Sequence, residues 1–66
     1  MLDRNKLRGK IVENGLTSAQ VAKEIGLSES TFSRKLNSGD FGIEDAAKMI
    51  ELLNIQNPAE IFFAKQ

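Results

Sequence analysis

The sequence contains no cysteine and no histidine. This excludes a disulfide framework and a metal site built from thiolate or imidazole ligands. No apolar run approaches the roughly 20 residues that a membrane-spanning helix needs, so we expect a soluble, intracellular protein without a membrane partner. A chain of 66 residues has room for one domain, which buries only about 60% of the surface that its unfolded chain exposes. Apolar packing, alone or with oligomerisation, must therefore stabilise a thin core.

A net charge is also missing, because nine basic residues balance nine acidic ones. This balance argues weakly against nucleic acid as a partner, since DNA-binding proteins usually carry a basic face. The distribution is uneven: residues 1–37 hold seven basic and four acidic residues, whereas residues 38–66 hold two and five. The two parts therefore carry charges of +3 and −3, as expected when one face meets phosphate. A scatter of solvated charges would give the same numbers, so both interpretations stay open.

The local patterns predict an all-α fold of five short helices, since no stretch alternates with period two. The first helix is expected over residues 3–14, followed by Gly15 where a left-handed C-cap belongs. The second begins at Thr17, whose spacing to Gln20 is that of a capping box. It ends after about two turns at Gly26.

The third helix is predicted to open at Ser28, a favourable N-cap, and to turn Phe32 and Leu36 inward. Residues 37–39, asparagine, serine and glycine, form its stop signal.

The fourth helix is expected over residues 43–53, with Gly42 as a possible N-cap and Asn54 as a left-handed end. Its predicted buried face consists of Ala46, Ala47, Ile50 and Leu53. A fifth short helix is predicted over residues 59–64, after an Asn57 N-cap and a proline at the first helical position. Glu60 completes the spacing of a second capping box.

The most informative stretch spans residues 16–39. Two short helices joined by a tight turn through Gly26 and Leu27 cannot form an antiparallel hairpin and must cross steeply, as in a helix-turn-helix. Ala22 would let the third helix approach closely, and Gly26 would permit the positive φ of the turn. A plain bundle without a ligand does not need this corner.

This stretch resembles the phage repressor and Cro-type helix-turn-helix regulators, the XRE family. The residues that carry the resemblance are Thr17, Gln20, Ala22, Ile25, Gly26, Leu27, Ser28, Phe32, Asn37, Ser38 and Gly39. The alanine pair at 46–47 and residues 52–55 also resemble the fourth helix of that family and its exit. The resemblance implies one lambda-repressor-like domain over residues 1–66. It further implies a sequence-specific transcriptional regulator that binds a pseudo-palindromic operator in double-stranded DNA, in the cytoplasm of a bacterial or phage-infected cell.

The DNA-reading face can be placed by helical angle. With Phe32 pointing inward, Ser30 and Arg34 fall almost opposite it at about 100° per residue. By resemblance, the base-reading positions are Glu29, Ser30, Thr31 and Arg34. Arg34 matches guanine as a bidentate donor, although a solvated arginine or a phosphate contact is the alternative. Glu29 could read cytosine or only favour the helix dipole.

Phosphate contacts are expected from Thr17 and Ser18, where backbone amides at a helix start point outward. The other candidates are Asn37 and Ser38, together with Lys10, Lys23 and Lys35 at longer range. Two departures from the family pattern, Asp40 in place of a common basic residue and Ser18 in place of a common glutamine, predict weak phosphate binding.

A dimer contact is predicted near the C-terminus. Ile61, Phe62 and Phe63 are consecutive and would cover roughly 200° of a helix, so a small core cannot bury all three. Phe62 and Phe63 are the candidate contact residues, with Phe63 as the more exposed. The homodimer is expected to be weak and to be strengthened on DNA.

The main alternative is a protein-interaction module that has lost DNA binding and docks another regulator. An enzyme is not expected, because without histidine or cysteine catalysis would need carboxylates or lysines in a cleft. We expect no cofactor, no metal and no small-molecule ligand.

Overall fold

The computed structural model describes residues 1–64, and within this range it contains five helices and no strand. The helices are α1 (Arg4–Glu13), α2 (Ser18–Glu24), α3 (Glu29–Ser38), α4 (Ile43–Leu52) and α5 (Pro58–Phe62). The predicted all-α class is therefore confirmed for the described residues. Lys65, which enters the charge of the second part of the chain, lies outside them. No helix of residues 1–64 is long and apolar enough to cross a bilayer.

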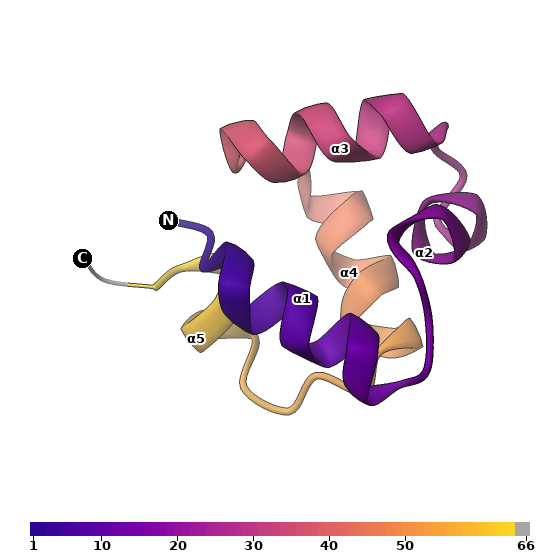
Figure 1. Cartoon of the computed structure of the whole chain (residues 1–66). Helices are drawn as coiled ribbons and strands as arrows, with labels where there is room; N and C mark the ends of the chain where they lie inside the picture. Colours follow the sequence, from indigo (N-terminus) through magenta and orange to yellow (C-terminus); the bar gives the residue numbers. More distant parts are fainter. Residues whose placement is uncertain (65–66) are drawn as a thin grey trace.

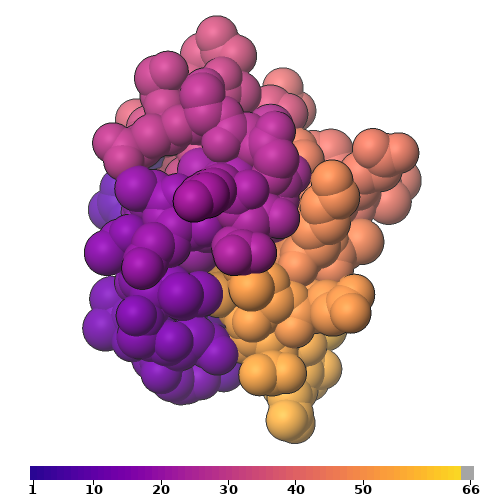
Figure 2. Space-filling view, turned by 90° about the vertical axis from the view of Figure 1, so that its right-hand side faces the viewer, coloured from indigo at the N-terminus to yellow at the C-terminus, as the bar shows by residue number. Residues whose placement is uncertain are grey.

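The helices form two roughly opposed layers joined by α4. Figure 1 shows α1 and α3 on opposite sides, with α4 running between them and α5 beside the N-terminal end of α1. Figure 2 shows α2 packed between α3 above and α1 below, with α4 and the loop after it alongside. All five helices therefore surround one core.

The core consists of apolar side chains from every helix and from the helix ends. Its buried members are Leu7, Ile11, Val21, Ala22, Ile25, Phe32, Leu36, Met49, Leu53, Ile55 and Ile61. Among the described residues no polar or charged residue is buried. Forming the core therefore requires no desolvation of a charged side chain, and the burial of apolar surface stabilises it.

Side-chain caps define where the first three helices begin. The Asp3 carboxylate accepts a hydrogen bond from the Lys6 amide at 3.1 Å. Thr17 and Gln20 form the predicted capping box, with reciprocal bonds of 2.8 and 3.2 Å. The Ser28 hydroxyl accepts from the Thr31 amide at 3.2 Å, which confirms the predicted start of α3. Each cap satisfies amides that have no partner inside the helix.

The predicted helix ends are also observed. Gly15 and Asn54 have φ values of 71° and 53°, in the left-handed region where each was expected. Gly39 is the C-cap of α3 with φ 74°. Helix α3 therefore continues through Asn37 and Ser38, which were predicted to end it together with Gly39. The C-cap of α4 is Leu53, one residue earlier than predicted.

One predicted core position in α4 is wrong. Ala47 is exposed, whereas Met49, which was not predicted, is completely buried. The inward stripe of α4 runs from the half-buried Ala46 through the buried Met49 to the buried C-cap Leu53, spaced three and four residues apart. Ala47 lies about 100° round from Ala46 and falls outside that stripe.

The cap and the end of α5 also differ from the prediction. The Asn57 side chain makes no capping bond, because the Glu60 amide donates to the Asn57 carbonyl at 3.1 Å instead. The helix ends at Phe62 rather than Ala64. The Ala64 amide donates to the Met1 carbonyl at 2.7 Å, so the N-terminal segment takes the bond that would have continued the helix.

Candidate nucleic-acid interface

The corner between α2 and α3 turns the chain sharply. Figure 1 shows α2 nearly end-on while α3 lies across the view, so their axes are strongly inclined. Gly26 has φ 83°, a conformation that costs a side-chain-bearing residue roughly 1–2 kcal/mol. The Leu27 amide closes the turn by donating to the Ala22 carbonyl at 2.8 Å. Ala22 itself is 1% exposed, so no larger side chain fits there without displacement.

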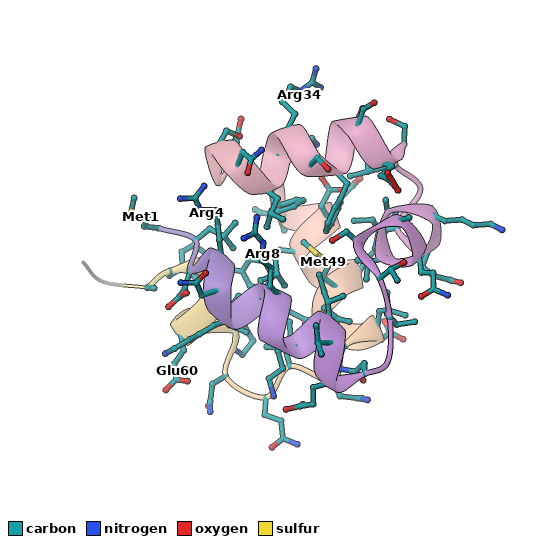
Figure 3. All side chains as sticks on the ribbon, viewed as in Figure 1. Met1, Arg4, Arg8, Arg34, Met49 and Glu60 are labelled. Atoms are coloured by element: carbon teal, nitrogen blue, oxygen red, sulfur yellow. The ribbon has the colours of Figure 1, made fainter. Side chains whose placement is uncertain are left out.

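Helix α3 has one buried face and one exposed face. Phe32 and Leu36 point into the core, and the Phe32 ring packs against Phe41 with centroids 5.4 Å apart. On the other side Ser30 and Arg34 are exposed, as their helical angle predicted. Figure 3 shows Arg34 extending away from the body of the molecule. A polar and cationic strip is therefore held outward by the apolar anchors beneath it.

The other two residues predicted to read bases lie at the start of α3. Glu29 is exposed in its first turn. Thr31 is half-buried, and its hydroxyl oxygen accepts a 2.8 Å hydrogen bond from the Ser28 hydroxyl. The Thr31 hydroxyl hydrogen, the second lone pair of its oxygen and its methyl group can still contact a ligand.

The predicted phosphate contacts at the start of α2 are partly engaged within the chain. The Thr17 amide donates to the Gln20 side-chain oxygen, and the Thr17 hydroxyl accepts from the Gln20 amide. Ser18 is half-buried beside them. The capping box therefore uses the Thr17 amide that the sequence pattern assigned to phosphate.

Two predicted phosphate-binding lysines have carboxylate partners. Lys35 forms a 2.9 Å ion pair with Asp45, whose side chain is only 15% exposed. Lys10 pairs with Glu13 at 3.2 Å and lines a groove against residues 55–61, not one against α3. A phosphate would therefore have to compete with Glu13 for Lys10 and with the less exposed Asp45 for Lys35.

Asn37 and Ser38, the remaining predicted phosphate contacts, are exposed at the end of α3. They line a groove of about 540 Å³ together with two arginines of α1 that the sequence interpretation did not single out, Arg4 and Arg8. The Arg4 guanidinium donates to the Asn37 carbonyl at 3.3 Å, across 33 residues of sequence. The four-residue spacing of these arginines places them on one helix face and was the signal available in the sequence.

The chain belongs to a family of proteins of unknown function, DUF739, whose model matches residues 1–65. No protein with a curated description matches the chain, and no solved structure matches it. The family description names no activity.

Proposed function

We propose that this member of the DUF739 family is a sequence-specific regulator that binds double-stranded DNA, with α2 and α3 as a helix-turn-helix. The observation that carries the proposal is the division of α3 into two faces. Phe32 and Leu36 are buried, while Ser30 and Arg34 are exposed on the opposite side. A helix held in this way presents donors to the major groove, which is wide enough to admit it.

Arg34 is the principal base-reading residue in this proposal. Its exposed guanidinium has the fork geometry that matches O6 and N7 of guanine. Ser30 can donate or accept on an adjacent base, and the Thr31 methyl fits a thymine methyl. Glu29, in the first turn, either accepts from cytosine N4 or favours the dipole of α3 and acts against bases that offer it no donor.

A symmetric homodimer would place two copies of α3 on two half-sites. Support comes from the C-terminal segment, where Ile61 is buried and Phe62 is half-buried. Phe63 is 75% exposed, as the sequence predicted, and an exposed aromatic ring beside apolar neighbours is a suitable contact. A contact made by one exposed ring and its neighbours gives a weak dimer, and simultaneous binding of both half-sites strengthens the dimer.

A protein-interaction module without DNA binding is the second candidate. The zero net charge and the ion pairs that occupy Lys10 and Lys35 favour it. Ile43, 89% exposed at the start of α4, would supply an apolar contact outside α3. The two candidates differ in whether the isolated protein binds duplex DNA at low salt.

The test is selection of binding sites from random duplexes, followed by mobility shifts at several salt concentrations. A DNA-binding regulator selects an inverted repeat with half-sites about 10 to 10.5 base pairs apart centre to centre. Its affinity falls as salt rises, because phosphate contacts release counterions. Absence of any salt-sensitive shift, with selected or bulk DNA, rejects the proposal in favour of the interaction module.

A further inference from the structure

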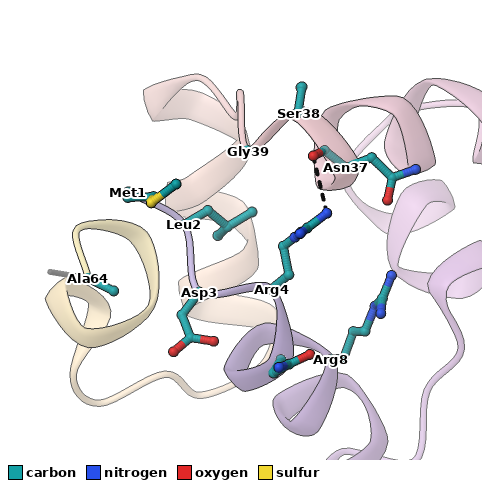
Figure 4. Close-up of a pocket in the computed structure, with 10 residues that line it drawn as sticks. Met1, Leu2, Asp3, Arg4, Arg8, Asn37, Ser38, Gly39 and Ala64 are labelled. Carbon is teal, nitrogen blue, oxygen red and sulfur yellow. Dashed lines mark hydrogen bonds between the residues drawn. The ribbon is translucent and has the colours of Figure 1, made fainter. Parts of the chain in front are cut away.

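The groove between the start of α1 and the end of α3 gathers positive charge. Its walls include Arg4, Asn5 and Arg8 from one side and Asn37, Ser38 and Gly39 from the other. Figure 4 shows both arginine side chains directed from α1 toward the end of α3. The Asp3 carboxylate, also at this groove, points away from them in the same view and caps α1 through the Lys6 amide at 3.1 Å.

The two arginines of this groove have no carboxylate partner among the described residues, whereas Lys10 and Lys35 each have one. Lys10 and Lys35 are paired with Glu13 and Asp45. Arg4 uses one N–H on a neutral carbonyl, and within residues 1–64 the Arg8 guanidinium makes no hydrogen bond or ion pair. Since a guanidinium carries five N–H donors, most of the guanidinium donors in this groove remain available.

The N-terminal segment is anchored, so the arginines have a defined position. The Asp3 amide donates to the Ile61 carbonyl at 2.6 Å, and the Ala64 amide donates to the Met1 carbonyl at 2.7 Å. Leu2 lies against the C-cap of α3, where a Cβ added to Gly39 would be 3.6 Å from the Leu2 Cβ. The start of α1 is thereby held at one edge of α3.

We propose that Arg4 and Arg8 bind adjacent phosphates of one DNA strand, beside the base pairs contacted by α3. This inference rests on the proposed function and adds a phosphate site to it. Arginine is suited to the role because its planar fork binds phosphate oxygens bidentately. Asn37 and Ser38 supply uncharged polar groups along the same edge. The site contributes affinity without sequence preference.

The test compares Arg4→Gln, Arg8→Gln and the double variant with Lys6→Gln as the matched control. Lys6 is exposed on the same helix, about 200° round from Arg4, and it lines the separate groove against residues 55–61. Each single variant removes one positive charge. A general effect of net charge therefore affects all three singles equally, whereas a phosphate contact affects only the arginine variants.

The measurement is affinity for the selected duplex as salt is raised fourfold, from about 50 to 200 mM. Each phosphate contact contributes about 0.9 to the slope of log affinity against log salt. Loss of one arginine should therefore reduce the salt-induced weakening by about 3.5-fold, and loss of both by about 12-fold. Base preference at the selected site should not change, and Lys6→Gln should keep the wild-type slope.

Of the two arginines only Arg4 bonds to the end of α3, so Arg4→Gln could lower the stability of the fold as well as DNA affinity. Thermal unfolding of each variant measures its stability. If Arg4→Gln is less stable than the wild type, the result for Arg8→Gln decides the outcome. Wild-type binding with equal slopes for Arg8→Gln and Lys6→Gln overturns the phosphate site and leaves the proposed function intact. Failure of the wild-type protein to bind any duplex overturns both.

Discussion

The close contact between α2 and α3 at Ala22 gives the sharpest test of the structure. Ala22 is 1% exposed in a core that includes Phe32, and its carbonyl receives the bond that closes the turn. Ala22→Leu adds three carbons where no space is available. Overpacking of this kind typically costs about 1–3 kcal/mol. A domain of this length has a total stability of only about 3–10 kcal/mol at the usual value per residue.

The expected consequence is a large loss of thermal stability. At roughly 4–8 °C per kcal/mol for a domain of this size, a cost of about 2 kcal/mol lowers the melting temperature by about 8–16 °C. Circular dichroism during heating and during urea titration measures it. Because α3 would have to move away from α2, the DNA affinity of the protein that remains folded should fall as well.

Ala19→Leu is the matched control for this substitution. Ala19 lies on the same helix but is exposed, so the same chemical change should alter stability by less than about 0.5 kcal/mol. Equal melting temperatures for Ala22→Leu and Ala19→Leu would show that α2 and α3 do not pack as described. Loss of stability in both variants would point to a helix-wide effect instead.

Three further predictions address other regions. Arg34→Ala should weaken binding to the selected site by about 1–3 kcal/mol and relax preference at one base pair; equal weakening on selected and random duplexes would make Arg34 a phosphate contact. Phe63→Ala should weaken self-association in sedimentation and reduce the share of two-to-one complexes on DNA. Phe62→Ala removes a ring packed against the core, so it should lower the stability of the protein as well. If neither change alters stoichiometry, the dimer contact lies elsewhere. Gly9→Ala should stabilise the protein by up to about 1 kcal/mol, since Gly9 is exposed inside α1 with nothing within 4 Å of an added Cβ. Gly39→Ala should instead destabilise the protein by about 1–2 kcal/mol, because Gly39 has φ 74°. Chemical denaturation of both variants measures the two changes in the free energy of unfolding.

Most helix boundaries follow from the sequence alone, because they depend on interactions between residues three or four apart. Thr17 and Gln20 form their capping box, and Ser28 caps α3 through the Thr31 amide. Gly26 adopts the positive φ that its place between two helices requires. The inward turn of Phe32 also follows from helical periodicity alone. Such features need no knowledge of what lies across the molecule.

Local pattern was insufficient where a second acceptor competes for the same amide and where the direction of the core decides which residue is buried. The Asn57 capping bond was predicted from spacing, but the carbonyl of that residue takes it. The last turn of α5 was predicted to continue, but the Ala64 amide donates to Met1 instead. In α4, two adjacent alanines looked equivalent, and only the direction of the core distinguished the exposed Ala47 from the stripe that buries Met49.

The charges of the candidate interface were decided by tertiary structure. Lys35 looked like a phosphate contact, yet Asp45, ten residues away on the next helix, compensates its charge. The spacing of Arg4 and Arg8 shows only that they share a helix face, yet the fold brings them to the end of α3, where Asn37 is 33 residues from Arg4. Residue type fixes how many charges the chain carries. Which of them remain available to a ligand depends on the distances between side chains of different helices, and those distances exist only once the helices have packed.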